Sequence, residues 1–277
     1  MSSAIGHLWR RHVTAHLDAA DAAAAEERLA SRGGRLEPRA EALVVTLTGA
    51  LVLTGMSYGV LSRDVQRRLA DGLLALCQDV SPQLREALTP YEALLPLATW
   101  TLGALFLYLL VPWLVARFAL GRSLSDLGLN ARGLRHHLTL YAALFAPVLL
   151  AVLVVASTPA FQAKYPFYQS PRGLPDLVVW ESLYLLQFLA LEFFFRGFLV
   201  HGTRRQLGSF AAFVPLVPYV MIHFSKPLLE TLGAVIAGSV LGLMSLRTGS
   251  VAGGVLIHGA VAVSMDMAAL AYRGVAW

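Results

Sequence analysis

The sequence predicts an all-α protein, a polytopic transmembrane helical bundle of about seven spans preceded by an N-terminal amphipathic helix. Apolar residues make up 57% of the chain and charged residues only 14%. An ordinary soluble domain carries about 25% charged residues. Mean hydropathy is +0.62. Several apolar stretches also reach the roughly 20 residues that a helix needs to cross a bilayer.

The predicted spans follow the apolar stretches along the chain. They are residues 42–61, 93–116, 136–157, 176–200, 209–223, 229–246 and 251–271. The fifth stretch is short and contains Pro215 and Pro218. Because proline interrupts the hydrogen bonding of a helix, the sequence leaves the start of this span open.

The chain divides by composition into three predicted regions. Residues 1–41 form an N-terminal segment rich in Ala, Glu and Arg, typical of an amphipathic or surface helix. Residues 42–119 hold the first two spans, and between them residues 63–88 repeat apolar side chains at helical spacing. That pattern predicts an interfacial helix on the outer surface of the membrane. Residues 120–277 form the predicted functional core.

Basic residues predict the orientation, because Arg and Lys concentrate on the cytoplasmic side of membrane proteins. With seven spans, four groups of arginines fall on one side: 28, 32, 35 and 39; 117, 122, 132 and 135; 204 and 205; and 247. This side is predicted to be cytoplasmic, with the N-terminus on it. The loop with arginines 63, 67, 68 and 85 is an exception. The Arg-rich, Lys-poor composition suggests a bacterial protein of the inner (cell) membrane.

Charge and cysteine content exclude several functions. The net charge of +5 is spread over loops, so no nucleic-acid partner is expected. Cys77 is the only cysteine, which excludes an intramolecular disulfide and a cysteine-rich metal site. The apolar composition makes membrane lipids an expected partner.

Two charged residues interrupt the apolar run 183–200. Glu192 and Arg196 are separated by one helical turn, so their side chains share a helix face and can form an ion pair. Charges at this depth in a bilayer are costly, and they usually face a bundle interior or a water-filled cavity. This pair is therefore the first candidate for a functional site.

Two histidines extend the candidate site. His223 ends the predicted fifth span and His258 lies within the seventh. At a rise of about 1.5 Å per residue, both come to nearly the same membrane depth as Glu192.

In the sixth span, Ala234, Gly238 and Gly242 recur every four residues, which predicts close helix packing.

These residues resemble the motifs of the CAAX-protease and bacteriocin-processing (CPBP) family of glutamic-type intramembrane proteases. The motifs are Glu192-x-x-x-Arg196, Tyr219-x-x-x-His223 and His258-x-x-x-Ala262. The loop 123–129 is also similar to one common in the family, and the resemblance covers about 120–277. It implies an intramembrane endopeptidase that hydrolyses a peptide bond in a membrane-associated protein or peptide.

The chain departs from the family pattern at two positions. Members of the family usually have two adjacent glutamates in the first motif, and the catalytic role is generally assigned to the first of them. This chain has Leu191 at that position. An Asn or Asp of the third motif is replaced by Ala262, and Asp266 lies one helical turn further on. The departures predict a variant with a single Glu in the first motif.

The resemblance and the chemistry of hydrolysis together assign a role to each residue. Glu192 is predicted to activate water as general base, with Arg196 as its ion-pair partner. His223 is predicted to orient the water. His258, assisted by Asp266, is predicted to stabilise the oxyanion. We expect no cofactor. The alternative is zinc bound by Glu192, His223 and His258, because one Glu and two His form a known catalytic ligand set.

Two other functions remain open at this point. One is a non-catalytic membrane protein on the same fold, such as a scaffold, an immunity factor or a maturation partner. The other is a small transporter that uses the same buried polar groups. Many transporters contain inverted repeats, and the sequence shows none. The endopeptidase is the favoured interpretation.

Overall fold

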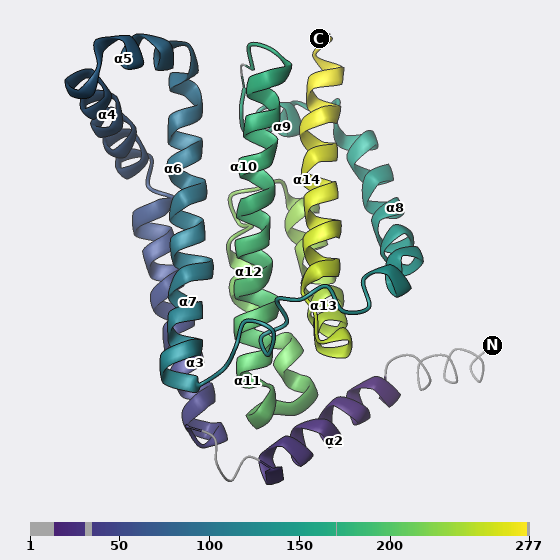
Figure 1. Cartoon of the computed structure of the whole chain (residues 1–277). Coiled ribbons are helices and arrows are strands. Elements are labelled where there is room, and N and C mark those ends of the chain that lie inside the picture. The colour runs from purple at the N-terminus through teal and green to yellow at the C-terminus, as the bar shows by residue number, and fades with distance from the viewer. Residues whose placement is uncertain (1–13, 31–34, 170, 276–277) are drawn as a thin grey trace. The chain divides into compact units, whose positions relative to one another are not determined.

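The computed structural model describes residues 14–30, 35–169 and 171–275, and the regular secondary structure within these ranges is helical throughout (Figure 1). Six of the described helices are long and apolar enough to cross a membrane. They are Pro38–Val60, Pro82–Leu120, Arg135–Val155, Leu174–Phe213, Leu228–Thr248 and Ala252–Tyr272. The prediction of an all-α, polytopic membrane protein is confirmed, and the predicted number of spans is close.

The spans combine α-helices with short π- or 3-10 segments, which carry η labels. The N-terminal half contains α2 (Ala15–Ala30), α3 (Pro38–Gly55), η2 (Met56–Val60), α4 (Arg63–Val80), α5 (Pro82–Leu88), η3 (Thr89–Leu94), α6 (Leu95–Ala104), η4 (Leu105–Leu110), α7 (Val111–Leu114) and η5 (Val115–Leu120). The C-terminal half contains η6 (Arg135–His137), α8 (Leu138–Val155), α9 (Pro159–Gln162), α10 (Leu174–Glu192), η7 (Phe193–Leu199), α11 (Val200–Leu207), η8 (Gly208–Phe213), α12 (Leu216–Met221), α13 (Leu228–Thr248) and α14 (Ala252–Tyr272).

The predicted fifth span, 209–223, is not one continuous helix. The chain there forms the 3-10 segment η8 and then the single short helix α12. Pro215 stands at the N-cap of α12, and Pro218 lies inside it. Neither proline can donate a backbone hydrogen bond, which explains why a long helix does not form.

The predicted interfacial helix, 63–88, is also divided. Ser81 ends α4 in an extended conformation and caps α5 by accepting a hydrogen bond from the backbone of Leu84. Pro82 follows at the first position of α5, where its missing N–H is tolerated. One apolar stripe of α4 is buried in the protein, at Ala70, Leu74 and Cys77. A second stripe, at Leu69, Leu73, Leu76 and Val80, is exposed. The exposed stripe is compatible with an interfacial position, which stays a prediction.

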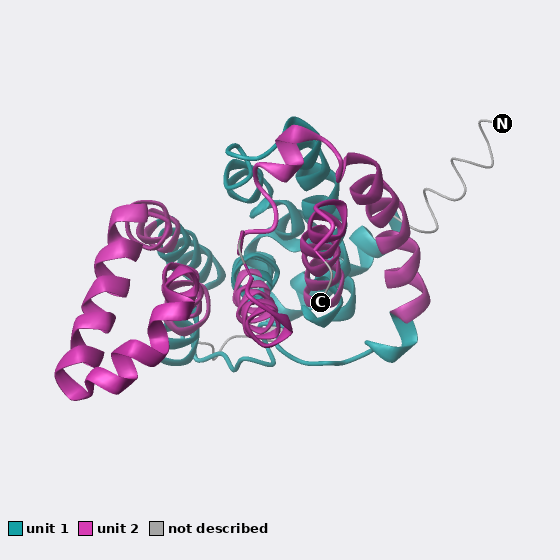
Figure 2. Cartoon of the chain, turned by 90° about the horizontal axis from the view of Figure 1, so that it is seen from above, with its two compact units in different colours: residues 1–50, 112–137, 192–254 teal, residues 51–111, 138–191, 255–277 magenta. Residues whose placement is uncertain are grey.

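Backbone contacts divide the chain into two compact units that interleave along the sequence (Figure 2). Unit 1 comprises Met1–Ala50, Pro112–His137 and Glu192–Gly254. Unit 2 comprises Leu51–Val111, Leu138–Leu191 and Val255–Trp277. These units follow packing rather than chain order, and so they differ from the predicted regions 1–41, 42–119 and 120–277.

The N-terminal helix α2 is held to unit 1 by polar contacts. The carboxylate of Asp21 accepts hydrogen bonds from the backbone N–H of Ser209 at 2.7 Å and from its hydroxyl at 3.0 Å. Glu27 forms an ion pair with Arg204. The prediction of a surface helix in this region is met by α2, whereas residues 1–13 and 31–34 of the predicted segment lie outside the described residues.

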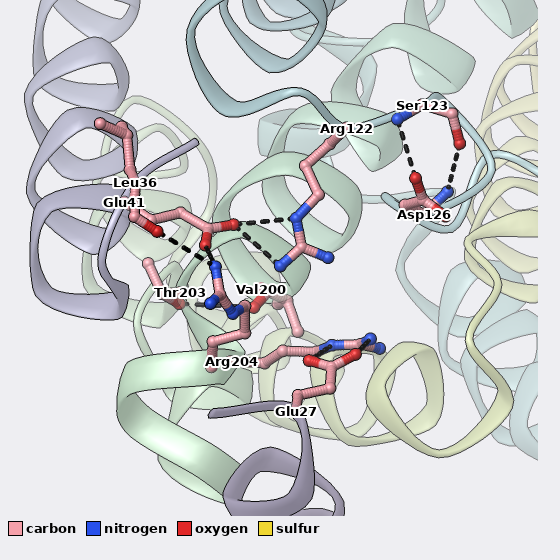
Figure 3. A network of polar contacts seen from close by, with 10 residues as sticks. Glu27, Leu36, Glu41, Arg122, Ser123, Asp126, Val200, Thr203 and Arg204 are labelled. Atoms are coloured by element: carbon pink, nitrogen blue, oxygen red, sulfur yellow. Dashed lines mark hydrogen bonds and ion pairs between the residues drawn. The ribbon is translucent and has the colours of Figure 1, made fainter. Parts of the chain in front are cut away.

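Unit 1 contains a buried carboxylate between two arginines (Figure 3). Glu41, in the first turn of α3, is 1% exposed. Its Oε1 accepts a hydrogen bond from Nε of Arg122 at 3.0 Å, and its Oε2 pairs with Arg205. The network ties the start of α3 to the end of η5 and to α11.

The small-residue stripe of α13 packs as predicted. A Cβ on Gly238 would lie 2.8 Å from the side chain of Leu216 and 3.0 Å from that of Tyr219. A Cβ on Gly242 would collide with the carbonyl oxygen of Ala212. The absence of side chains therefore lets η8 and α12 approach α13 closely.

The loop 121–130 closes unit 1 against the turn before α14. The backbone N–H of Val251 donates to the carbonyl of Gly128 at 2.8 Å, and the amide of Asn130 donates to the carbonyl of Gly249, also at 2.8 Å. The loop is itself braced by Asp126, which accepts a backbone hydrogen bond from Ser123 at 2.9 Å (Figure 3). That hydrogen bond lowers the pKa of the Asp126 carboxyl below its usual value.

Unit 2 is built around aromatic side chains of α10. Trp180 and Tyr184 stack with ring centroids 4.8 Å apart, and Tyr184 contacts Phe188 at 4.7 Å. Trp100 of α6 packs on the first two rings at 6.3 and 6.1 Å. Such offset and tilted pairs add stability beyond their buried area.

Candidate catalytic site

The Glu192–Arg196 ion pair forms as predicted, inside unit 1. Nη1 of Arg196 lies 3.1 Å from Oε1 of Glu192, and the two residues are 1% and 0% exposed. Both charges are therefore removed from bulk solvent. Each would be costly without the other, because an isolated buried charge loses its hydration.

The helix changes its winding at this point. Glu192 is the last residue of α10, and Phe193 begins the π-segment η7, which carries Arg196. Single π-turns inside α-helices are frequent at functional sites. The sequence prediction of a regular helix through this motif did not include this change.

A series of hydrogen bonds links η7 and α11 to Ser245 of α13. The hydroxyl of Ser245 donates to the carbonyl of Arg196 at 2.9 Å, so it accepts from Nε2 of His201, which is 3.0 Å away. A Cβ on Gly197 would lie 2.8 Å from the carbonyl oxygen of Leu127. The loop 123–129 thus packs directly beside the residue that follows Arg196.

Tyr219 of α12 joins the ion pair to the second motif. The guanidinium carbon of Arg196 lies 3.9 Å from the centroid of the Tyr219 ring, a cation–π contact. Phe195 meets the same ring edge-on at 5.4 Å. Tyr219 is buried and is further held by Gly238 of α13.

His223 completes this group, which we call the Glu192 cluster: Glu192, Arg196, Tyr219 and His223. The His223 ring lies 4.8 Å from the Tyr219 ring, and its Nδ1 is 2.8 Å from the Tyr219 carbonyl oxygen. Because α12 ends at Met221, His223 stands in the turn after the helix. All members of the cluster belong to unit 1.

Gly254, near the start of α14, allows the backbone to approach Glu192. A Cβ at this position would collide with Oε2 of Glu192 and would lie 3.1 Å from its carboxylate carbon. The ion pair with Arg196 opposes any displacement of that carboxylate.

Replacing Gly254 with alanine is therefore expected to destabilise the protein by about 1–3 kcal/mol, the usual cost of overpacking a core. The matched control is Gly233→Ala in α13, where a Cβ meets no atom within 4 Å. The control should be neutral or stabilising by about 0.5–1 kcal/mol, because alanine favours helix. Melting temperatures measured in one detergent compare the two variants. Equal melting temperatures would contradict the packing role of Gly254.

The other two predicted site residues lie in unit 2. The ring of His258 packs on Phe188 with centroids 4.4 Å apart. Asp266 is fully buried, and its Oδ2 accepts a hydrogen bond from the indole N–H of Trp180 at 2.8 Å. Ala262, between them, belongs to the aromatic core cluster.

The zinc alternative stays a prediction, because its proposed ligands are divided between the two units: Glu192 and His223 in unit 1, His258 in unit 2. Within the described part of the chain, no three His, Cys, Asp or Glu side chains are grouped so that they could hold a metal ion. The reaction proposed below uses residues of the protein alone.

Comparison with protein families identifies the segment that carries these motifs. Residues 173–264 match the family model described as "Type II CAAX prenyl endopeptidase Rce1-like". The match covers about a third of the chain, and over it the sequence is similar to this family of endopeptidases. No curated protein and no solved structure matches the chain. The family is one of proteases, and the apolar helices make the chain an integral membrane protein.

The matched segment contains the first four predicted site residues and excludes the fifth. Glu192, Arg196, His223 and His258 fall within the match, whereas Asp266 lies beyond its end. Leu191, at the position of the usual first glutamate, is buried and apolar. The carboxylate that pairs with Arg196 is thus the only acidic residue of the first motif.

Two residues of the matched segment were not predicted as part of the site. Tyr219 appears in the sequence motifs only as the first residue of the second motif, and Gly254 belongs to none of the three motifs. The aromatic ring four residues before a buried histidine was a usable signal for Tyr219, since one helical turn brings the two together. No local pattern indicates that Gly254 contacts Glu192, because that contact joins distant segments.

Proposed function

We propose that this protein is an intramembrane endopeptidase that hydrolyses a peptide bond in a membrane-associated protein or peptide. The observation that carries the proposal is the Glu192 cluster. It places a buried carboxylate, its guanidinium partner and an imidazole together within a segment that matches a protease family.

The cluster contains the groups that water activation needs. Glu192 is the carboxylate of the family motif, and His223 offers a nitrogen base in the same unit. Arg196 holds its guanidinium beside the Glu192 carboxylate and over the Tyr219 ring, so the positive charge of the cluster is fixed next to both groups.

His258 and Asp266 enter the proposal through the sequence motifs. His258 is assigned to oxyanion stabilisation, and it follows Gly254 by one helical turn in α14. Asp266 is assigned to support His258 in place of the missing polar residue at Ala262. The proposed setting is the inner membrane of a bacterium, with the N-terminus in the cytoplasm, lipids as neighbours and no cofactor.

Peptide cleavage by the purified full-length protein tests the proposal. The probes are two quenched fluorescent peptides that end in a CAAX sequence, one with a farnesylated cysteine and one without. His223→Ala should lower kcat by about 10²–10⁴-fold, the usual contribution of a general base, and Glu192→Ala should also abolish most cleavage because it removes the carboxylate that pairs with Arg196. Ser182→Ala, at an exposed position of α10, should leave cleavage unchanged.

Folding of each variant is checked by size-exclusion chromatography. Cleavage of either peptide by the wild type, lost in both cluster variants, supports the proposal. Absence of cleavage by the wild type, or cleavage that survives both alanine substitutions, would count against it.

A specific observation favours a second candidate, a non-catalytic membrane protein on the same fold. Leu191 replaces the first motif glutamate, and Glu192 is fully buried in its ion pair. For this candidate, Glu192→Ala and His223→Ala would change stability but leave the cellular phenotype of the protein intact. The two candidates therefore differ in one measurable outcome.

A further inference from the structure

We infer that Nε2 of His223, rather than the Glu192 carboxylate, accepts the proton from the attacking water. This inference rests on the proposed function and specifies its base. It assigns Glu192, Arg196 and Tyr219 to positioning. It also accounts for a first motif that has a single glutamate.

The first argument is the hydrogen bond of His223. Its Nδ1 lies 2.8 Å from the carbonyl oxygen of Tyr219. A carbonyl oxygen can only accept, so Nδ1 must carry a hydrogen and donate it. In the neutral ring the other nitrogen, Nε2, then holds the lone pair. The bond to the backbone therefore selects the tautomer in which Nε2 is the base.

The second argument is the position of Glu192. Its carboxylate is paired with Arg196 at 3.1 Å and closely packed against Gly254. If Glu192 took a proton, it would lose its charge and leave a buried guanidinium without a counter-ion, which is strongly unfavourable. Glu192 is also 0% exposed, whereas His223 is 8% exposed and is the most accessible member of the cluster.

The third argument is the placement of Tyr219 between the two groups. The guanidinium carbon of Arg196 lies 3.9 Å from the centroid of the Tyr219 ring, and the Tyr219 carbonyl oxygen accepts the hydrogen bond from Nδ1 of His223. One buried residue thus fixes both the ion pair and the tautomer of the base. Holding catalytic groups through a rigid second layer is a common requirement of an active site.

Every proton and electron pair of the reaction is accounted for when His223 is the base. Nε2 of His223 takes a proton from water while the water oxygen forms a bond to the scissile carbonyl carbon. The carbonyl π electrons move to the oxygen. The imidazolium then returns that proton to the amide nitrogen as the C–N bond breaks and the C=O bond re-forms. The products are a carboxylic acid, which ionises, and a free amine.

Nitrogen-15 NMR of histidine-labelled full-length protein tests the tautomer without a substrate. The chain has eight histidines, and the spectrum of His223→Gln identifies the signals of His223 by their loss. At a pH where the ring is neutral, we expect a protonated Nδ1 and an unprotonated Nε2. A protonated Nε2 in the neutral ring would overturn the inference.

A matched pair of amide substitutions tests the assignment by cleavage of the same two peptides. Glu192→Gln should lower the melting temperature, because it leaves the Arg196 guanidinium without a counter-ion, but the kcat of the folded protein should fall by only about tenfold. His223→Gln should lower it by about 10²–10⁴-fold. Melting temperatures separate loss of folding from loss of chemistry.

The outcomes distinguish the inference from the proposed function. If Glu192→Gln loses as much activity as His223→Gln while both variants remain folded, the protease function stands and the inference fails. If the wild type cleaves neither peptide, the proposed function fails, and the inference fails with it.

Discussion

Replacing Arg196 with methionine is expected to lower the free energy of unfolding by about 3–5 kcal/mol, the usual loss when one partner of a buried ion pair is removed. Arg196 is 1% exposed and its partner Glu192 is 0% exposed, so water cannot replace the missing guanidinium without reorganisation of the core. The cation–π contact with Tyr219 is lost as well. We therefore expect most of the variant to be recovered unfolded or aggregated.

The double variant Glu192→Met/Arg196→Met separates charge burial from packing. Apolar residues of similar length that replace a whole buried ion pair are often neutral or stabilising. The double variant should therefore be more stable than Arg196→Met alone, although it should not cleave peptides. Unfolding titrations in mixed micelles measure both changes. A double variant no more stable than Arg196→Met alone would contradict the assignment of the loss to an unpaired buried charge at Glu192.

Replacing Glu41 with leucine should also lower the free energy of unfolding by about 3–5 kcal/mol, because it removes one side of a buried ion pair. This carboxylate is buried and faces two arginines in unit 1 (Figure 3). The Arg205 side chain is 6% exposed and would remain as a buried, uncompensated charge. Arg122 is 18% exposed and can regain water more easily, so most of the loss should come from Arg205.

Glu27→Ala provides the control for this prediction. Glu27 pairs with Arg204, also in unit 1, but their side chains are 34% and 28% exposed. A pair this accessible to water typically contributes about 0.2–1 kcal/mol. The same unfolding titration should show a much smaller loss for Glu27→Ala than for Glu41→Leu. Similar losses would contradict the assignment of the stability to burial.

Much of the candidate site was predictable because its parts are encoded locally. Glu192 and Arg196 are one helical turn apart, and the i, i+4 spacing alone brings two side chains together on a helix. The apolar run around them indicated burial, because charges within a membrane span rarely face lipid. The packing role of Gly238 and Gly242 followed from the same kind of local spacing.

The remaining features depend on contacts between distant segments. The ring of Tyr219 meets Arg196 only because α12 packs beside η7, and Gly254 meets Glu192 only because α14 begins next to them. The change to π-winding at Phe193 and the break of the predicted fifth span were also missed. Pro215 and Pro218 explain the break, whereas no local sequence pattern indicates the π-winding.

By itself, the sequence determined that the protein is an all-helical membrane protein and that its C-terminal half carries protease-family motifs. Apolar periodicity and residue spacing can be read from one segment of the chain, without knowing which other segments pack against it. Only the tertiary structure decided that the imidazole of His223 donates to the Tyr219 carbonyl and that Glu192 is closed in by Arg196 and Gly254. Gly254 and Glu192 lie far apart in the chain, so only packing brings them together. The His223 contact is local, but it depends on how the chain turns after α12 ends, which the sequence pattern does not indicate.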